Sequence, residues 1–428
     1  MLDSPRHESG WQRTFPGSGG LLCSAHPIVA ADQDAELSQQ FRELQKQVQQ
    51  QQETIEQLKQ KVAAFEERRE PEPPPREPTS LGKVHLSGEG GVAFFHTGSE
   101  GRFPSSEFRV DEAKLFIEAP IWNDLYVFGE INFVTREETR EQLWLGELYL
   151  DFENISQLWK RDGQLNLRVG RFDIPFGEEY LTRDAIDNPL ISHSLSDIWG
   201  VDEGVELFGA IGKFRYVAAV QNGGYSALRD LDADKALVGR LSYDPLEWLH
   251  VSASAMRTGK LNADDDFLSE LWFGNGFIRS VGSLATTTTF EAQVFEGDVR
   301  VRLPRGHIQA AGGYLNYDDN DSAADNRRDV YYYYVEALHQ VSDKLYAAAR
   351  WSHILADDGF PLVGHGDFTE FFYYQLTEDL WRLSVGLGYR FSPNLLFKAE
   401  YTLEQGTKVD GTHRTREDFV AAEVAFKF

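Results

Sequence analysis

The chain has 428 residues, with 42 Lys and Arg against 68 Asp and Glu, a formal net charge of −26 and a single cysteine. An acidic balance of this size argues against nucleic acid as a partner, and one cysteine excludes an intramolecular disulfide. No run of about 18 apolar residues occurs, so the sequence offers no transmembrane helix.

The first 31 residues are expected to form a signal or leader region. Residues 19–31, GGLLCSAHPIVAA, combine a short apolar core with small residues near Ala30 and Ala31, as in a cleaved export signal. The residues before them contain Pro, Gly and acidic side chains, which a leader usually lacks. Attachment of a lipid to Cys23 is the alternative, although the Gly-Leu-Leu before it matches a lipobox poorly.

Residues 36–69 carry an uninterrupted heptad pattern. Their core residues recur at alternating spacings of four and three, which places them on one seam of a coiled coil. Gln51 is the only polar residue of that seam. A lone amphipathic helix would show the same periodicity, but the Gln- and Glu-rich flanks favour self-association. The seam consists of Leu37, Phe41, Leu44, Val48, Gln51, Ile55, Leu58, Val62 and Phe65.

Residues 70–82, EPEPPPREPTSLG, contain five prolines. This composition favours polyproline geometry, so we expect a Pro-rich, semi-rigid linker after the coiled coil.

Residues 83–428 repeat one pattern. Stretches of roughly ten residues alternate apolar and polar side chains, as strands do when one face contacts lipid and the other water. Short turns such as 212–213 and 304–306 alternate with long loops rich in Asp and Gly. A soluble β-sandwich or propeller, the alternative fold, does not predict that alternation of loop lengths. We therefore predict an all-β transmembrane barrel of sixteen antiparallel strands, at 83–97, 106–119, 124–135, 142–153, 164–173, 202–211, 213–222, 236–244, 248–257, 289–303, 306–317, 329–341, 344–354, 379–391, 394–405 and 417–428.

An even strand number places both barrel ends on the short-turn, periplasmic side, and with them the coiled coil. Trp and Tyr near strand ends fit aromatic girdles at the two membrane interfaces. The last strand ends in Phe428 after alternating apolar residues, which resembles the signal read by the outer-membrane assembly machinery. Outer-membrane lipid and lipopolysaccharide are the expected surroundings.

The strand phase assigns charged side chains to the lumen. Basic residues occur mostly on later strands and acidic residues mostly on early ones, so a transverse field across the pore is one hypothesis. The other hypothesis is that these charged residues pair with one another and only solvate the lumen. The inward basic residues are Arg168, Arg215, Arg240, Arg300, Arg302, Arg350, Arg382, Arg390 and Lys398. The inward acidic residues are Glu112, Glu118, Glu130, Glu147, Asp151, Glu336 and Glu400.

The long loop at 176–201 is the main functional candidate. At about 25 residues it exceeds the usual loop length, which points to function. A loop exposed to water would not need apolar residues such as Ile186 and Leu190, so we expect the loop to fold into the barrel and narrow the pore. An exposed flap or a latch between subunits is the alternative. The charged residues expected at the constriction are Glu178, Glu179, Arg183, Asp184, Asp187 and Asp197.

The stretch from Arg168 to Glu179, RVGRFDIPFGEE, resembles the junction between strand and constriction loop in the phosphate-selective porin O/P superfamily. The coiled coil and linker resemble those of its trimeric members with a periplasmic N-terminal coiled coil. The resemblance implies a homotrimer of water-filled channels, with the third loop as the constriction. Phosphate-selective members carry a basic constriction, whereas 176–203 holds seven acids against Arg183. The acidic loop predicts cations or neutral solutes instead.

Other groups of residues give weaker indications of a functional site. Asp264–Asp266 and Asp318–Asp321 offer oxygen ligands for Ca²⁺ in extracellular loops but lack EF-hand spacing, so solvated loops are favoured over a cofactor site. No metal cluster and no catalytic motif is expected. We predict a non-enzymatic porin of the bacterial outer membrane that passes small hydrophilic solutes and ions by diffusion. The alternatives are a specific anion channel for phosphate or dicarboxylates, a structural tether through the coiled coil, and a barrel enzyme.

Overall fold

A computed structural model of the chain describes residues 83–101, 103–134, 143–195, 198, 200–223, 233–262, 286–360 and 376–428. The expected leader (1–31), coiled coil (36–69) and linker (70–82) lie outside these ranges. None of the helices among the described residues is both long and apolar enough to cross a membrane.

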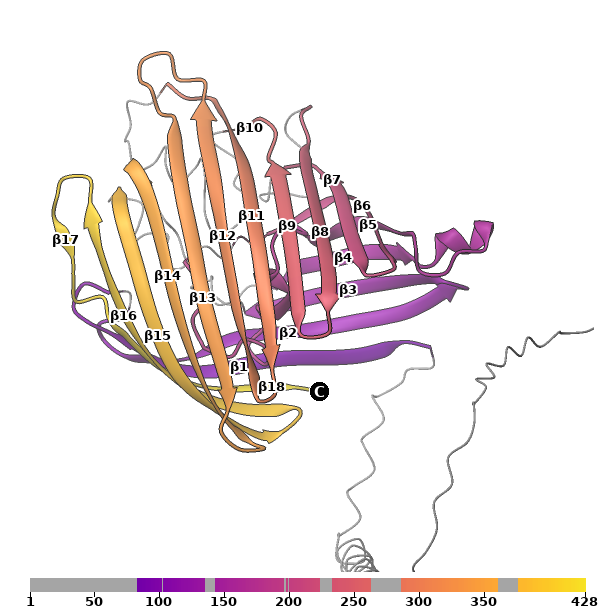
Figure 1. Ribbon diagram of the computed structural model, residues 1–428, viewed down its shortest axis with the longest axis horizontal. Helices are drawn as coiled ribbons and strands as arrows, with labels where there is room; N and C mark the ends of the chain where they lie inside the picture. The colour runs from indigo at the N-terminus through magenta and orange to yellow at the C-terminus, as the bar shows by residue number, and fades with distance from the viewer. Residues whose placement is uncertain are drawn as a thin grey trace, which may run out of the picture. The chain divides into compact units, whose positions relative to one another are not determined.

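The described residues form one antiparallel sheet that closes on itself (Figure 1). Each long strand pairs with its neighbours along the chain, and β1 pairs with both β2 and β18. The sixteen long strands are β1 (His85–Thr97), β2 (Glu107–Trp122), β3 (Leu125–Val134), β4 (Trp144–Phe152), β5 (Asn166–Asp173), β6 (Val201–Ile211), β7 (Phe214–Gln221), β8 (Ala236–Leu246), β9 (Leu249–Arg257), β11 (Thr289–Leu303), β12 (Gly306–Asp319), β13 (Arg328–Gln340), β14 (Leu345–Phe360), β15 (Thr377–Ser392), β16 (Leu395–Lys408) and β18 (Phe419–Lys427). The predicted sixteen-stranded antiparallel barrel is confirmed.

Four short elements complete the described chain. The strands β10 (Leu261–Asn262) and β17 (His413–Arg414) extend the sheet beside β11 and β16. The 3-10 helix η1 (Ile155–Trp159) lies between β4 and β5, and η2 (Glu179–Thr182) lies in the long connection between β5 and β6. At the turns of one end the chain reverses within a few residues, for example between β6 and β7, where Gly212 has a positive φ of 64°.

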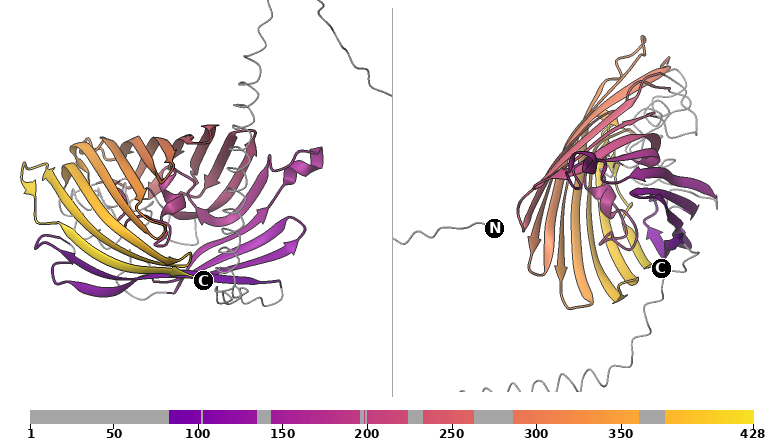
Figure 2. Two further views of the ribbon diagram at one scale, coloured as in Figure 1. Left: turned by 60° about the horizontal axis from the view of Figure 1, so that its bottom comes forward. Right: turned by 90° about the vertical axis from the view of Figure 1, so that its right-hand side faces the viewer.

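The two faces of each strand differ in burial, as alternation requires. On β13, Tyr331 and Val335 are 54% and 45% exposed, whereas Tyr332 and Glu336 are buried. Figure 2 shows the sheet curving around an interior. Because the sheet closes, the buried face of each strand points into this interior and the exposed apolar face points out; we call these the inner and outer faces. On β16 the expected outward Phe397 is exposed. The outer face has the apolar surface that a membrane would cover.

The barrel closes where a glycine of β1 meets the last residue. Gly88 N donates to Phe428 O at 3.1 Å and Phe428 N donates to Gly88 O at 2.9 Å. A Cβ on residue 88 would lie 2.6 Å from Phe428 Cζ and 2.8 Å from Lys114 O. The close approach of the terminal ring and the β2 backbone therefore requires glycine here.

Replacement of Gly88 by alanine is expected to destabilise the closed barrel by about 1–3 kcal/mol, as overpacking does. The measurement is the temperature at which detergent-solubilised protein loses its fast, folded migration on a gel. Gly239→Ala is the matched control, because its Cβ would meet nothing closer than Val217 O at 3.9 Å. Equal transition temperatures for the two variants would refute the steric role of Gly88.

Candidate functional site

The connection from Ile174 to Gly200 is held by apolar side chains. Ile186, Leu190, Ile191 and Leu195 are each at most 2% exposed. Leu181, another apolar residue of the connection, is 54% exposed and does not anchor it.

These side chains pack against inner-face residues on both sides of the barrel. Leu195 and Ile198 belong to a buried cluster with residues of β8, β9 and β11–β15, such as Tyr332. Ile186 and Leu190 pack in a second cluster with residues of β14, β16 and β18, and Ile191 packs in a third with residues of β1 and β18. The connection is therefore fixed to many strands at once.

Basic side chains of the last strands bind the backbone of this connection. Arg350 Nη1 donates to Ser192 O at 2.8 Å, and Arg382 Nη1 donates to His193 O at 3.3 Å. Lys398 Nζ donates to Ala185 O at 2.7 Å and to Leu190 O at 2.9 Å. All three cations are at most 5% exposed. Arg390, at the short-turn end of β15, makes a longer contact of 3.4 Å with Ile186 O.

Each of the three buried cations also has a carboxylate partner. Arg350 pairs with Glu336 at 2.5 Å, Arg382 with Glu404 at 2.5 Å and Lys398 with Glu423 at 2.8 Å. Three of the four basic residues of β14–β16 that were expected to line a lumen are thus each compensated by one carboxylate, and Arg390 has only backbone contacts among the described residues. A buried charge without such a partner would cost several kcal/mol, which is why the pairs occur.

Acidic side chains satisfy the amide groups of the same connection. Glu400 accepts hydrogen bonds from Ile191 N at 2.5 Å and Ser192 N at 2.9 Å, and from the Ser192 hydroxyl. Glu112 accepts one from Ala185 N at 2.8 Å. Side chains of the barrel thus satisfy backbone groups that would otherwise be buried without partners.

The acidic residues of the connection are themselves mostly paired. Glu178 lies 3.0 Å from Ser242 Oγ, 3.2 Å from His250 Nε2 and 3.8 Å from Arg240 Nε. Burial alone would raise the pKa of Glu178, but Arg240 and His250 more than offset it, so its pKa lies below the ordinary value.

The remaining charged residues of the connection differ in their surroundings. Glu179 accepts from Ser194 N at 2.8 Å and Ser194 Oγ at 2.5 Å. His193 Nε2 contacts the backbone oxygen of Arg183 at 3.1 Å. Asp187 is 52% exposed, with Lys427 Nζ at 4.0 Å. Asp197 lies outside the described residues.

Asp184 forms a short ion pair with Lys114 Nζ of β2, at 2.6 Å. Burial opposes ionisation of this carboxyl, but Lys114 outweighs it and lowers the pKa of Asp184 to about 2. Lys114 was not among the expected site residues, although the inward phase of its strand, between Glu112 and Glu118, already indicated it.

A loss of this ion pair at low pH is expected to loosen the connection. A carboxyl whose folded pKa is depressed stabilises the fold above its unfolded pKa, near 3.8, and loses that contribution as the pH falls towards about 2. Single-channel current noise should therefore rise between about pH 4 and pH 2. Asp184→Asn should be noisy already at neutral pH, and a quiet Asp184→Asn channel would contradict the role of the pair.

Four of the expected basic residues gather around one hollow of about 530 Å³. Arg215, Arg240, Arg300 and Arg302 line it, together with His250. Arg215 pairs with Asp244 at 2.9 Å, and Arg240 is held by the backbone of the connection at Gly177. Arg300 donates to the neutral Gln309, and Arg302 donates to a backbone oxygen. Among the described residues neither of these two arginines has a carboxylate within ion-pair distance.

The expected acidic residues of the early strands lie on a different part of the barrel. We call the inner faces of β2–β6 the early wall. Asp151 pairs with Arg168 at 3.1 Å, and Glu147 accepts from Asp173 N at 2.9 Å. Glu130 accepts from Asn132 at 2.8 Å, and Glu118 is exposed.

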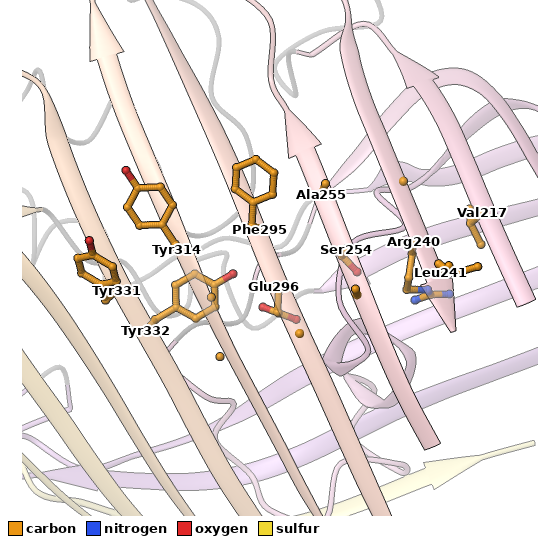
Figure 3. A pocket seen from close by; sticks show the side chains of 15 residues that line it. Val217, Arg240, Leu241, Ser254, Ala255, Phe295, Glu296, Tyr314, Tyr331 and Tyr332 are labelled. Atoms are coloured by element: carbon orange, nitrogen blue, oxygen red, sulfur yellow. The ribbon is translucent and has the colours of Figure 1, made fainter. Parts of the chain in front are cut away.

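A second, more open hollow of about 900 Å³ is lined in part by small residues of β8, β9, β11 and β12 (Figure 3). Phe295 and Leu241, which border it, are 50% and 53% exposed on the outer face. Buried inner-face residues such as Ser254 and Tyr332 line it as well, and it shares Val217 and Arg240 with the hollow of arginines.

The expected calcium ligands are in part outside the described residues, as Asp264–Asp266 are. Of the described group, Asp319 accepts hydrogen bonds from Tyr317 and Asn326, and Asp321 accepts from Ala323 N. Across the described residues, no group of three or more His, Cys, Asp or Glu side chains is arranged to hold a metal ion. Calcium binding stays the less favoured alternative to solvated loops.

Comparison with known proteins places the fold. No family model and no curated protein matches the chain. Among solved structures, OmpT, an outer membrane protein of Vibrio cholerae, aligns with a TM-score of 0.53 at 12% identity over 81% of this chain and 97% of that one. The outer membrane channel DcaP of Acinetobacter baumannii aligns equally well, at 13% identity over the same shares of the two chains. The chain has the barrel fold of the outer-membrane porins.

A trimer form of the Vibrio cholerae protein also aligns, with a TM-score of 0.53 at 12% identity over 81% of this chain and 99% of that one. Identities this low establish the fold alone. The narrower resemblance of residues 168–179 to the phosphate-selective porins stays a prediction, since no family model supports it.

Proposed function

We propose that the chain forms a water-filled channel in the bacterial outer membrane for passive diffusion of small hydrophilic solutes and ions. The connection 176–201 is the constriction of this channel. The observation that carries the proposal is the anchoring of this connection: Arg350, Lys398 and Glu400 of the late strands bind its backbone, and Lys114 of β2 binds its Asp184. A segment tied to both sides of a closed barrel narrows whatever passage the barrel encloses.

The strand number and a structure that shares the fold both support transport rather than catalysis. A sixteen-stranded barrel leaves a lumen wide enough for water. One of the structures that share the fold is named an outer membrane channel. Lys114, Arg350, Arg382, Lys398 and Glu400 are engaged in anchoring the connection, so we assign them no catalytic role.

Conductance in planar lipid bilayers tests the proposal directly. Purified protein should produce stepwise current increases in potassium chloride. Absence of any steps from protein that shows folded migration on a gel would overturn the channel and favour the structural tether.

We further propose that three copies assemble. A trimer form of a protein with this fold supports this, as does the heptad seam of 36–69 in the sequence. Cross-linking before and after deletion of 36–69 should show a trimer that is weakened without the coiled coil. If only monomers form with the full chain, the trimer is excluded.

A specific anion channel is the second candidate function. It is favoured by the hollow lined by Arg215, Arg240, Arg300 and Arg302, because arginine clusters attract carboxylates and phosphate. The reversal potential under a salt gradient separates the two functions. A strong anion preference favours the specific channel, and a weak preference favours general diffusion.

A further inference from the structure

A continuous stack of flat side chains crosses the early wall. The rings of Phe116 and Phe128 have centroids 5.9 Å apart at 26°, and those of Phe128 and Tyr149 are 5.1 Å apart at 23°. The Arg168 guanidinium follows, 4.1 Å from the Tyr149 centroid and 5.2 Å from that of Phe208. One residue from each of the five adjacent strands β2–β6 thus contributes to a single row.

The rings of this row present their edges to the interior. Rings that stack face to face across neighbouring strands stand upright on the sheet, so their faces are covered and their outer edges are free. Phe116, Phe128 and Tyr149 are only partly buried, so part of each ring is accessible, and Tyr149 also packs against the buried cluster that holds the connection. A ring edge carries partial positive charge and favours contact with the face of another aromatic ring. A flat aromatic solute lying along the row would meet this preferred geometry.

Carboxylates lie directly across from two of the rings on the paired strands β2 and β3. Glu118 lies directly opposite Phe128, and Phe116 lies directly opposite Glu130. Among the described residues, Glu118, Glu130 and Glu147 have no basic side chain within ion-pair distance. The cation nearest in sequence to Glu118, Lys114, is bound to Asp184. These carboxylates attract cations to the row and repel anions.

The wall already holds one organic cation, its own arginine. The Arg168 guanidinium lies between the Tyr149 and Phe208 rings, 3.1 Å from Asp151 and 3.5 Å from Glu206. Aromatic rings and carboxylates together are the chemistry that binds ammonium and guanidinium groups. The buried cations Arg350, Arg382 and Lys398 of β14–β16 are neutralised by their own carboxylate partners and so offset little of the negative potential of the early wall.

We infer that the early wall is a binding surface for aromatic organic cations, solutes that join an ammonium or guanidinium group to a flat ring. This inference rests on the proposed channel only for access. The ring of the solute lies on the edges of Phe116, Phe128 and Tyr149, and its cationic group pairs with Glu118, Glu130 or Glu147. Such solutes therefore dwell in the passage longer than simple ions of the same charge.

The test uses benzylammonium chloride as the probe in planar bilayers. It should interrupt the potassium chloride current at concentrations about tenfold lower than benzoate, the matched anion, and lower than cyclohexylammonium, which lacks a flat ring. Glu130→Gln combined with Glu147→Gln should weaken the benzylammonium block by about tenfold or more, since two carboxylates are lost. Equal block by benzylammonium and benzoate in the parent protein would overturn the inference.

Two further variants separate binding from folding. Phe128→Leu keeps apolar volume but removes a ring edge, so the benzylammonium block should weaken by about two- to tenfold while the cyclohexylammonium block stays. Glu118→Gln changes an exposed side chain and tests the charge contribution without disturbing packing. An unaltered benzylammonium block in both variants would also refute the inference.

Failure of the channel itself has a different signature. If no current appears in potassium chloride alone, the proposed function fails. Binding of benzylammonium to the detergent-solubilised protein, measured by calorimetry, then still tests the wall. Heat of binding in the parent that is lost in the Glu130, Glu147 double variant supports the wall, and no heat in either protein excludes it.

Discussion

Replacement of Arg350 by methionine is expected to release the constriction and to destabilise the barrel at the same time. Arg350 is 4% exposed and holds Ser192 O and Asn188 Oδ1 on one side and Glu336 on the other. Its loss leaves the Glu336 carboxylate, which is fully buried, without its main partner. Breaking a buried pair from one side costs about 3–5 kcal/mol. Single-channel recordings should show a larger and noisier conductance, and the unfolding temperature should fall.

A double variant separates these two effects. Arg350→Met with Glu336→Gln removes both charges, and such neutral replacements of buried pairs cost little stability. The glutamine can still accept the hydrogen bond that Gln309 donates to Glu336. The unfolding temperature should recover, but the conductance should remain enlarged, because Ser192 O and Asn188 still lack their donor. A double variant with the parental conductance would show that Arg350 does not hold the constriction.

The barrel could be predicted because its pattern is local. Alternation along 394–405 assigns Phe397 outward and Lys398 inward without any knowledge of neighbouring strands, and the structure agrees on both. The prediction was less complete at the long-loop end. The strand β14 continues to Phe360, whereas the predicted strand ended at residue 354. Beyond that point the sequence reads Leu-Ala-Asp-Asp-Gly, which does not alternate, because a strand above the membrane has no lipid-facing side to maintain.

The partners of the charged residues could not be predicted in the same way. The phase of β14 places Arg350 inside, but its acceptor Ser192 is 158 residues away in the chain. Nothing local distinguishes Arg350, which is buried under the connection, from Arg302, which lines an open hollow. The expected division between a basic and an acidic side therefore needs a refinement: buried cations on β14–β16 that are compensated by carboxylates, arginines of β11 without a carboxylate partner, and a negative early wall.

Replacement of Arg300 and Arg302 by glutamine is expected to shift ion selectivity towards cations several-fold. Both line the hollow, and neither has an ion-pair partner among the described residues, so their charges act undiminished on ions that pass. The measurement is the reversal potential under a potassium chloride gradient. Arg257→Gln is the control, because this arginine pairs with Asp234 away from the hollow and its loss should leave the reversal potential unchanged.

Neutralising an acidic residue of the connection tests whether the connection contributes to ion selectivity. Asp187 is half exposed and its only cationic neighbour among the described residues is Lys427, at 4.0 Å, so Asp187→Asn should move selectivity towards anions. Neutralisation of Glu178 or Asp184 is expected to act differently, because each is bound to a cation and its removal also loosens an anchor. If Arg300 and Arg302 dominate the ion selectivity of the parent channel, that channel prefers anions strongly and the Arg300→Gln, Arg302→Gln variant loses this preference. The specific anion channel is then the better description. If the arginine variant and Asp187→Asn each shift a weak ion preference by small and opposite amounts, the arginines of the hollow and the acids of the connection balance each other. The chain is then a general diffusion channel.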